Sequence, residues 1–273
     1  MKIPVILIHN GCQDYLTCAI NQALKNNPVH LIGDGSLTGI GHENFNFEKI
    51  EDYKDECNEI RSVYEHLNTT PAEFEIFCYQ RWFILKAYMK KNNLEKIFYI
   101  DSDVLLFTDV TKEWKKFDQY TMTLLHRSAA VSSFITLEGV ENFCNLVLST
   151  FRNKSRYEYK KIASHYHVRN QCGLGGGVCD MTFLEFFHYD DAAGGGPGRV
   201  GEMMQIIDGS TYDHNINTPD QDFEFKNGIK NIKIINGIPF VYNTRLEKNV
   251  KFNSLHFCGG AKNLMRSVYE KCN

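Results

Sequence analysis

Short apolar runs alternate with helical stretches in the first part of the chain, and this alternation most constrains the fold. Ile3 to Ile8 is a continuous apolar run, about Cys12 to Lys25 has helical character, and Val29 to Ile32 is a second short apolar run. Strands buried on both faces are continuously apolar, and the helix between them supplies the crossover of a parallel pair. The sequence therefore predicts an α/β fold built on an open sheet.

Composition and charge exclude several classes of protein. The chain has 273 residues, 43% of them hydrophobic, so it can bury a large core and disorder is excluded. A net charge of -3 gives no reason to expect a nucleic acid or an anionic membrane as partner. No apolar run approaches the length of a membrane span, and the first run is too short for a signal peptide. Nine cysteines without a C-x-x-C pair favour a reduced, cytoplasmic compartment.

The next predicted helix begins near residue 70, where the sequence has residues typical of a helix N-terminus. Thr70 stands as the capping residue, Pro71 at the first helical position and Glu73 three residues after the cap. Arg81 falls on the apolar stripe of this helix, which comprises Phe74, Phe77, Cys78, Leu85, Tyr88 and Met89. A guanidinium on such a stripe needs a carboxylate or ligand partner, unless it extends to the helix edge.

A predicted buried strand, Lys96 to Ile100, runs directly into Asp101-Ser102-Asp103. Two carboxylates beside an apolar core repel each other and lose solvation unless a cation compensates them. Oxygen ligands of this kind suit Mn²⁺ or Mg²⁺, with substrate phosphate completing the coordination shell. A solvated turn that caps the next segment remains the alternative.

The segment YQRWFILKAYMKKNNLEKIFYIDSDVLLFTDVTKEW resembles the central block of glycosyltransferase family 8 and its GT-A relatives. His256-Phe257-Cys258-Gly259-Gly260-Ala261-Lys262 is similar to the family's His-x-x-Gly-x-x-Lys motif, and Asp220-Gln221-Asp222 to its Asp-Gln-Asp element. The chain departs from the family in lacking Pro-Trp after Lys262, and in having Gly175-Gly176-Gly177-Val178 where the family has an asparagine. The resemblance implies a single α/β domain of the GT-A type over 1–273, Rossmann-like, with a central mixed, mostly parallel sheet. Its nucleotide-binding part would lie at about 1–110 and its acceptor-binding part at about 111–273.

The resemblance also implies roles for individual residues. Asp101, Asp103 and His256 would bind the metal, Mn²⁺ or Mg²⁺. Asp220, Gln221 and Asp222 would stabilise the reacting sugar in a transfer that retains its anomeric configuration. The nucleotide-sugar donor, a UDP-sugar in most relatives, would be held by His9, Asn10, Asp34, Arg81, Asp101, Ser102, Gly259 and Lys262. The acceptor would be a carbohydrate or another hydroxyl compound.

Several polar groups have more than one interpretation. Asp180, within an apolar segment, is either an acceptor-side base or a helix cap. Together with Asp190 and Asp191 it is the candidate base if the transfer inverts configuration. His165-Tyr166-His167 is expected on a solvated strand or loop, and 194–198 in a glycine-rich loop. Further along, we expect a helix over about 138–150 and strands over 231–235, 240–242 and 255–257.

Three other classes of protein compete with a glycosyltransferase. A haloacid-dehalogenase-like phosphohydrolase also uses Asp-x-Asp, but on its first strand and with Thr or Val where Leu105 stands here. A non-catalytic nucleotide- or carbohydrate-binding module would have no need of the three predicted metal ligands and Lys262. A nucleotidyltransferase would need a lysine-rich glycine loop after the first strand, whereas Asn10-Gly11-Cys12-Gln13 has no lysine.

Overall fold

The structure, a computed structural model, describes residues 2–35, 41–126, 128–192 and 199–273. The glycine-rich loop expected at 194–198 lies outside the described residues, and so do the side chains of Asp190 and Asp191. None of the described helices combines the length and apolar character needed to cross a bilayer. All nine cysteines fall within the described ranges and have free thiols.

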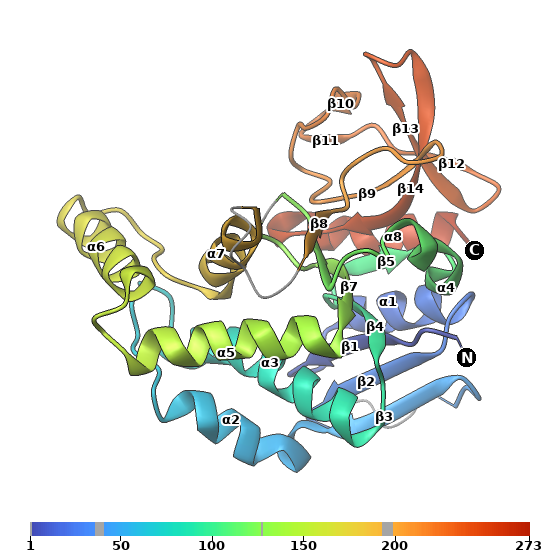
Figure 1. Ribbon diagram of the computed structural model, residues 1–273. Coiled ribbons are helices and arrows are strands. Elements are labelled where there is room, and N and C mark those ends of the chain that lie inside the picture. Colours follow the sequence, from blue (N-terminus) through green and yellow to red (C-terminus); the bar gives the residue numbers. More distant parts are fainter. Residues whose placement is uncertain (1, 36–40, 127, 193–198) are drawn as a thin grey trace.

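The α/β fold with a mixed, mostly parallel central sheet is confirmed (Figure 1). The sheet order is β3-β2-β1-β4-β7-β6-β8, with parallel pairing throughout except between β4 and β7 and between β7 and β6. Its strands are β1 Val5–His9, β2 Val29–Gly33, β3 Phe45–Lys49, β4 Lys96–Ile100, β6 Met122–Leu124, β7 Ser132–Thr136 and β8 Val200–Glu202. Because β6, β7 and β8 lie beyond residue 110, both predicted parts of the domain contribute to one sheet.

Two hydrophobic cores flank this sheet. Val5 and Leu7 of β1 belong to the core under α1 and α8, whereas Ile6 and Ile8 belong to the core under α2, α3 and α5. This alternation accounts for the unbroken apolar run of β1, since both of its faces are covered. The helices are α1 Asp14–Leu24, α2 Lys54–Arg61, α3 Ala72–Lys91, α4 Val110–Glu113, α5 Leu137–Arg152, α6 Tyr157–Gln171, α7 Asp180–Ala192 and α8 Lys262–Lys271, with 3₁₀ turns η1 Ile50–Tyr53, η2 Trp114–Lys116 and η3 Gly259–Ala261.

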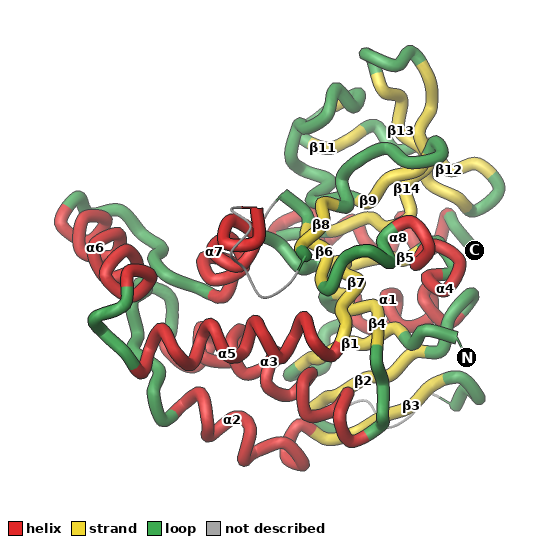
Figure 2. The backbone as a smooth tube through the Cα atoms, viewed as in Figure 1, coloured by secondary structure: helices red, strands yellow, loops and turns green. Residues whose placement is uncertain are grey.

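A second, smaller sheet forms the part of the molecule that is almost entirely strand and loop (Figure 2). It is composed of β5 Val104–Leu106, β9 Ser210–Tyr212, β12 Lys233–Ile235, β13 Ile238–Asn243 and β14 Lys248–His256, and a hairpin of β10 Phe225–Lys226 and β11 Ile229–Lys230 lies nearby. The predicted strands at 231–235, 240–242 and 255–257 fall in β12, β13 and β14, and the predicted helix at 138–150 falls in α5.

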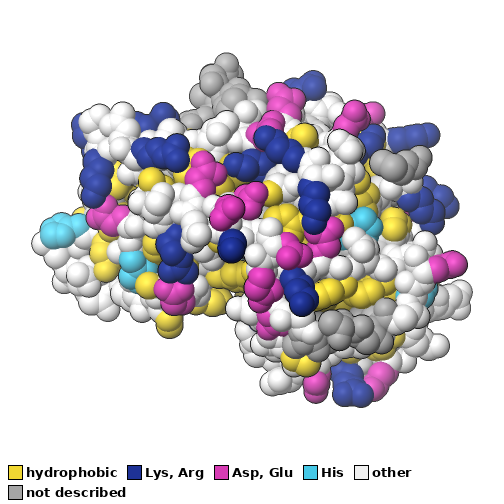
Figure 3. All heavy atoms as spheres, turned by 90° about the horizontal axis from the view of Figure 1, so that it is seen from below, with side chains coloured by type: hydrophobic (Ala, Val, Ile, Leu, Met, Phe, Trp, Pro, Cys, Tyr) yellow, Lys and Arg dark blue, Asp and Glu magenta, His cyan; other side chains and the backbone are white. Residues whose placement is uncertain are grey.

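Over the face seen in Figure 3, basic and acidic side chains are interspersed, in keeping with the small net charge.

Two local predictions are wrong. Pro71, not Thr70, immediately precedes α3, and the Thr70 hydroxyl donates to the Glu75 carboxylate at 2.5 Å instead of capping the helix. His165 and His167 are exposed on helix α6, not on a strand or loop. The helix was missed because its apolar positions are few, and Tyr159 and Ile162 are the buried residues that dock it.

The two sheets meet where β5 pairs with the end of β14. Val104 lies opposite His256 in this antiparallel ladder, and the Phe257 amide donates to the Asp103 carbonyl at 2.9 Å. The strand that follows Asp101-Ser102-Asp103 is therefore joined to residues about 150 positions later in the sequence. This pairing brings the two predicted motifs together.

Candidate functional site

A cavity of about 510 Å³ opens at the carboxyl ends of β1 and β4. This is the edge at which open α/β sheets bind their ligands. Seven of the predicted residues line it: His9, Asn10, Arg81, Asp101, Ser102, Asp103 and Lys262. The other lining residues include aromatic and polar side chains that no sequence motif indicated as part of a site: Gln13, Tyr15, Glu73, Phe74 and Phe77.

Two of the aromatic side chains that line the cavity, Phe74 and Phe77, come from the first turns of α3. Leu85, Tyr88 and Met89 are buried in the core, whereas Phe74 is 61% exposed and Phe77 half-buried. The apolar stripe of α3 therefore has two functions: its later part packs on the sheet and its first turns form a wall of the cavity. An apolar stripe alone could not distinguish these two uses.

Arg81 has the carboxylate partner that its position predicted, and a second one as well. It donates to Asp101 Oδ1 at 2.8 Å and to Asp180 Oδ2 at 2.6 Å. Tyr99 also donates to Asp101 Oδ1, at 2.9 Å. Both contacts of Asp101 therefore use one oxygen and fix its carboxylate at the cavity wall. Arg81 braces the Asp-x-Asp turn.

Asp180 is the buried counter-ion of this network. Its side chain is 4% exposed, and Oδ2 accepts from both Arg81 and Trp82 Nε1, the latter at 2.9 Å. It is the first residue of α7 and does not line the cavity. These contacts give Asp180 a structural use that neither of its two sequence interpretations included.

Asp103, His256 and Lys262 form a second cluster at this turn. His256 Nε2 lies 3.4 Å from Asp103 Oδ1, and Lys262 Nζ lies 3.1 Å from Asp103 Oδ2. Burial raises the pKa of Asp103, but the hydrogen bonds and charges of His256 and Lys262 outweigh it and hold this pKa below its usual value. Burial likewise lowers the pKa of His256, and Asp103 more than reverses that effect. Both pKa shifts favour a positive charge between Asp103 and His256.

The donor atoms of this cluster fit a divalent cation in part. Among the described residues, no three His, Cys, Asp or Glu side chains are gathered closely enough to hold a metal on their own. However, His256 Nδ1 faces the His214 carbonyl, which can only accept, so Nδ1 carries a proton and Nε2 of the neutral ring has a lone pair. That lone pair faces a carboxylate oxygen, an arrangement that requires a proton or a metal ion between them. Because Mg²⁺ and Mn²⁺ sites often have few protein ligands and use substrate phosphate for the rest, the pair fits such an ion.

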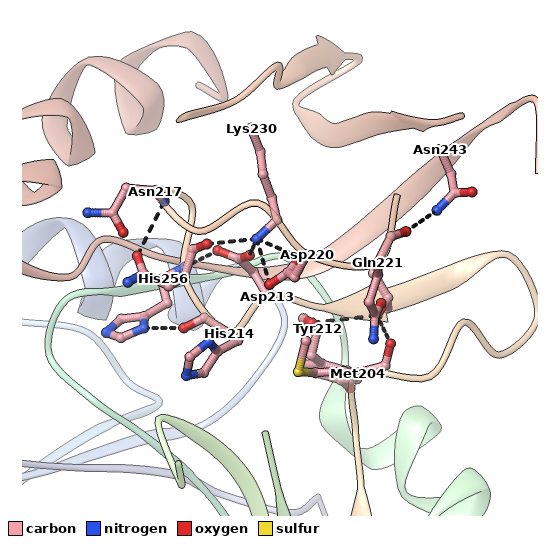
Figure 4. Close-up of polar contacts among 12 residues, drawn as sticks. Met204, Tyr212, Asp213, His214, Asn217, Asp220, Gln221, Lys230, Asn243 and His256 are labelled. Atoms are coloured by element: carbon pink, nitrogen blue, oxygen red, sulfur yellow. Dashed lines mark hydrogen bonds and ion pairs between the residues drawn. The ribbon is translucent and has the colours of Figure 1, made fainter. Parts of the chain in front are cut away.

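The predicted Asp220-Gln221-Asp222 element lies outside the 510 Å³ cavity. Asp220 pairs with the buried Lys230, at 3.1 Å. Gln221 and Asp222 line a separate open groove that also includes Arg245, and Asp222 Oδ2 lies 3.2 Å from the guanidinium of that arginine. Only Asp220 is linked to the residues around His256, through Lys230 and Asp213 (Figure 4).

Two predicted donor contacts lie at the margin of the site. Asp34 accepts from the Gly11 amide at 2.7 Å, so it organises the turn after β1. Gly259 has φ +58 in the turn before Lys262, and, apart from its chain neighbours, no atom of the described residues lies within 4 Å of the position that a Cβ would take there. The loop at Gly175–Gly177 instead packs on residues 67–69, away from the cavity, where the Gly176 carbonyl accepts from the Thr69 amide.

No protein-family model matches the chain, and no curated protein matches it. Solved structures do resemble it. Mouse xyloside xylosyltransferase 1 is 9% identical, with a TM-score of 0.49 over 72% of this chain and 84% of the other. An active-site mutant of LgtC is 12% identical, with a TM-score of 0.47 over 98% and 96%. A glycosyltransferase involved in glycosylation of the major capsid of PBCV-1 is 11% identical, with a TM-score of 0.40 over 98% and 99%. Likenesses this distant do not identify a function, so the chemistry must be judged from the side chains.

Proposed function

We propose that this protein is a glycosyltransferase of the GT-A type that transfers a sugar from a nucleotide-sugar donor, a UDP-sugar, to a hydroxyl group of a carbohydrate or another acceptor. The observation that carries the proposal is the meeting of Asp103, His256 and Lys262 beside Asp101 at one edge of the sheet. A site from which a diphosphate departs needs ligands for a divalent cation. It also needs an ammonium group that neutralises the charge of the diphosphate. The sequence resemblance supports the same conclusion.

Asp103 and His256 would hold Mn²⁺ or Mg²⁺, with Asp101 as a ligand of the metal or of the donor ribose. The bound cation would act as a Lewis acid on the departing diphosphate. Lys262 binds Asp103 in the free protein and is 37% exposed, so it can turn to the diphosphate once the charge of Asp103 is compensated. The open Gly259 turn leaves room for phosphate oxygens next to this lysine.

The donor nucleoside is expected at the carboxyl end of β1. His9 and Gln13 contact each other there, and Tyr15 lies beside them in the same cavity. Aromatic and amide side chains of this kind stack on a base and hydrogen-bond to its edge. Arg81 keeps Asp101 in place for the ribose or the metal rather than contacting the base itself.

The stereochemical part of the proposal is retention. A retaining transfer needs no carboxylate base for the acceptor, since the departing phosphate can accept the proton. Asp180, the described candidate for a base, has its carboxylate buried against Arg81 and Trp82. Asp220, Gln221 and Asp222 remain the proposed source of the group that stabilises the sugar. An NMR reading of the product from an α-linked donor decides the matter: an α-linked product is expected, and a β-linked product contradicts retention.

The decisive experiment is donor hydrolysis with radiolabelled UDP-sugars in the presence of Mn²⁺, with or without chelator. Wild-type protein should release UDP slowly, and Asp103→Asn should remain folded but lose this activity. Asp118→Asn is the matched control, because Asp118 is exposed and does not line the cavity. Turnover that persists in Asp103→Asn or in excess chelator contradicts the proposal. Release of phosphate from simple phosphomonoesters would instead indicate a phosphohydrolase.

A further inference from the structure

Lys230 is an unusual lysine, because its side chain is 1% exposed. The ammonium group donates to Asp213 Oδ1 at 2.8 Å, to the Asn215 carbonyl at 2.7 Å and to Asp220 Oδ2 at 3.2 Å (Figure 4). An ammonium group has three protons, and these three acceptors match them. A buried lysine satisfied in this way is fixed in position, and it fixes the groups that surround it.

The segment that Lys230 holds is the one that orients His256. Asp213 uses its other oxygen, Oδ2, to accept from the His256 backbone amide at 3.0 Å. The His214 carbonyl accepts from His256 Nδ1, and the Ile216 amide donates to the His256 carbonyl at 3.0 Å. Residues 213–216 thus hold the backbone of His256 on both sides and also fix the tautomer of its ring.

Lys230 is anchored to this segment through its backbone as well as its side chain. Its own amide donates to the Ile216 carbonyl at 2.7 Å. The contacts of its side chain fall on Asp213 and Asn215, the residues on either side of His214. The His214 carbonyl accepts the hydrogen bond from His256 Nδ1. It therefore lies between two residues that a single ammonium group holds in place.

We propose that Lys230 is a positioning residue for His256: through Asp213 and Asn215 it aims His256 Nε2 at Asp103, and so prepares the pair for a divalent cation. The inference rests on the proposed function only for the identity of the cation. Outer partners of metal-binding histidines fix the ring orientation, and their loss weakens metal affinity by about 10- to 100-fold. Lys230 lies one step further out, because it acts on the acceptors of the histidine.

The test measures Mn²⁺ binding to the full-length metal-free protein by electron paramagnetic resonance, for Lys230→Met and for Asp213→Asn. Asp213→Asn keeps the size of the side chain and serves as the deciding variant if Lys230→Met does not fold. Lys233→Met is the matched control, since Lys233 is an exposed lysine nearby in sequence. We expect the Mn²⁺ dissociation constant to rise by roughly 10-fold or more in the folded test variants and to remain unchanged in the control.

A second readout does not depend on the metal. The Nδ1–H resonance of His256, assigned by its loss in His256→Gln, should be present in the wild-type protein and should shift or broaden in both Lys230→Met and Asp213→Asn. Folded variants that keep the wild-type resonance and the wild-type Mn²⁺ affinity would overturn the positioning role. If the wild-type protein binds no Mn²⁺ while the resonance still responds, the cation is wrong and the role of Lys230 in orienting His256 stands.

Discussion

Removal of Arg81 should destabilise the protein strongly, and the contacts of Asp180 set the size of the effect. In Arg81→Met, Asp180 would retain the Trp82 N–H but lose its counter-ion while its side chain stays 4% exposed. Breaking a buried pair by removing one partner costs about 3–5 kcal/mol, because the remaining charge is uncompensated. At about 2–4 °C per kcal/mol for chains of this order of size, Tm should fall by roughly 10 °C.

The assay is thermal unfolding followed by circular dichroism, with a double-mutant cycle. Arg152→Met is the control, since Arg152 is 53% exposed and lies 3.6 Å from Glu59, a surface pair expected to contribute less than about 1 kcal/mol. In Arg81→Met/Asp180→Asn, a neutral amide can still accept from Trp82, so at least about 1 kcal/mol should be recovered. The reasoning is refuted if Arg81→Met loses no more stability than Arg152→Met, or if Asp180→Asn recovers nothing in its presence.

Three further predictions concern elements around the site. Burial alone would raise the pKa of Glu48, but hydrogen bonds from Lys91 and Tyr53 lower it overall, so Glu48 contributes stability above its unfolded pKa that is lost as pH falls through the depressed value. Glu48→Gln should therefore be less stable than wild type in urea unfolding at pH 7, and a difference that persists at pH 2 would contradict this assignment. Asp109 accepts from the Thr111 and Lys112 amides at the start of α4, so Asp109→Ala should cost about 1 kcal/mol in the same assay, and an unchanged midpoint would contradict the cap. A Cβ at Gly177 would lie 2.3 Å from the Leu67 carbonyl oxygen, so Gly177→Ala should cost roughly 1–3 kcal/mol, and a variant as stable as wild type would contradict the close packing of this loop.

Local physical chemistry predicted the strands of the central sheet well and the outer helices less well. β1, β2 and β4 were recognised because unbroken apolar runs are typical of strands with both faces covered. The prediction of a Thr70 cap was wrong because the Thr70 hydroxyl donates to the Glu75 carboxylate instead, a contact that the spacing of the residues did not indicate. Helix α6 was not predicted because its apolar residues are too few to show a helical period.

The candidate site was predictable only where a motif could be recognised. Nothing in the chemistry of Asp103 and His256 taken separately requires them to meet; the β5–β14 ladder brings them together, and only the family resemblance anticipated it. The sequence did not predict the burial of Lys230, because a lysine in a polar, glycine-containing stretch is ordinarily exposed. Its burial depends on Asp213 and Asp220, at least ten residues away in sequence, and pairing of this kind becomes visible only in three dimensions.

The ladder between β5 and β14 also has a consequence for the order in which a newly made chain can become functional. Until Ser254 to His256 leave the ribosome, β5 lacks this partner and Asp103 has neither His256 nor Lys262 beside it. The strands β1, β2 and β4 can pair much earlier, because their sequence is complete by Ile100. Contacts between residues so far apart in sequence form slowly relative to local ones. Ribosome-bound chains halted before residue 250 should therefore contain the parallel strands but no completed cluster of Asp103, His256 and Lys262, so the proposed affinity for metal cannot arise until His256 and Lys262 have been made.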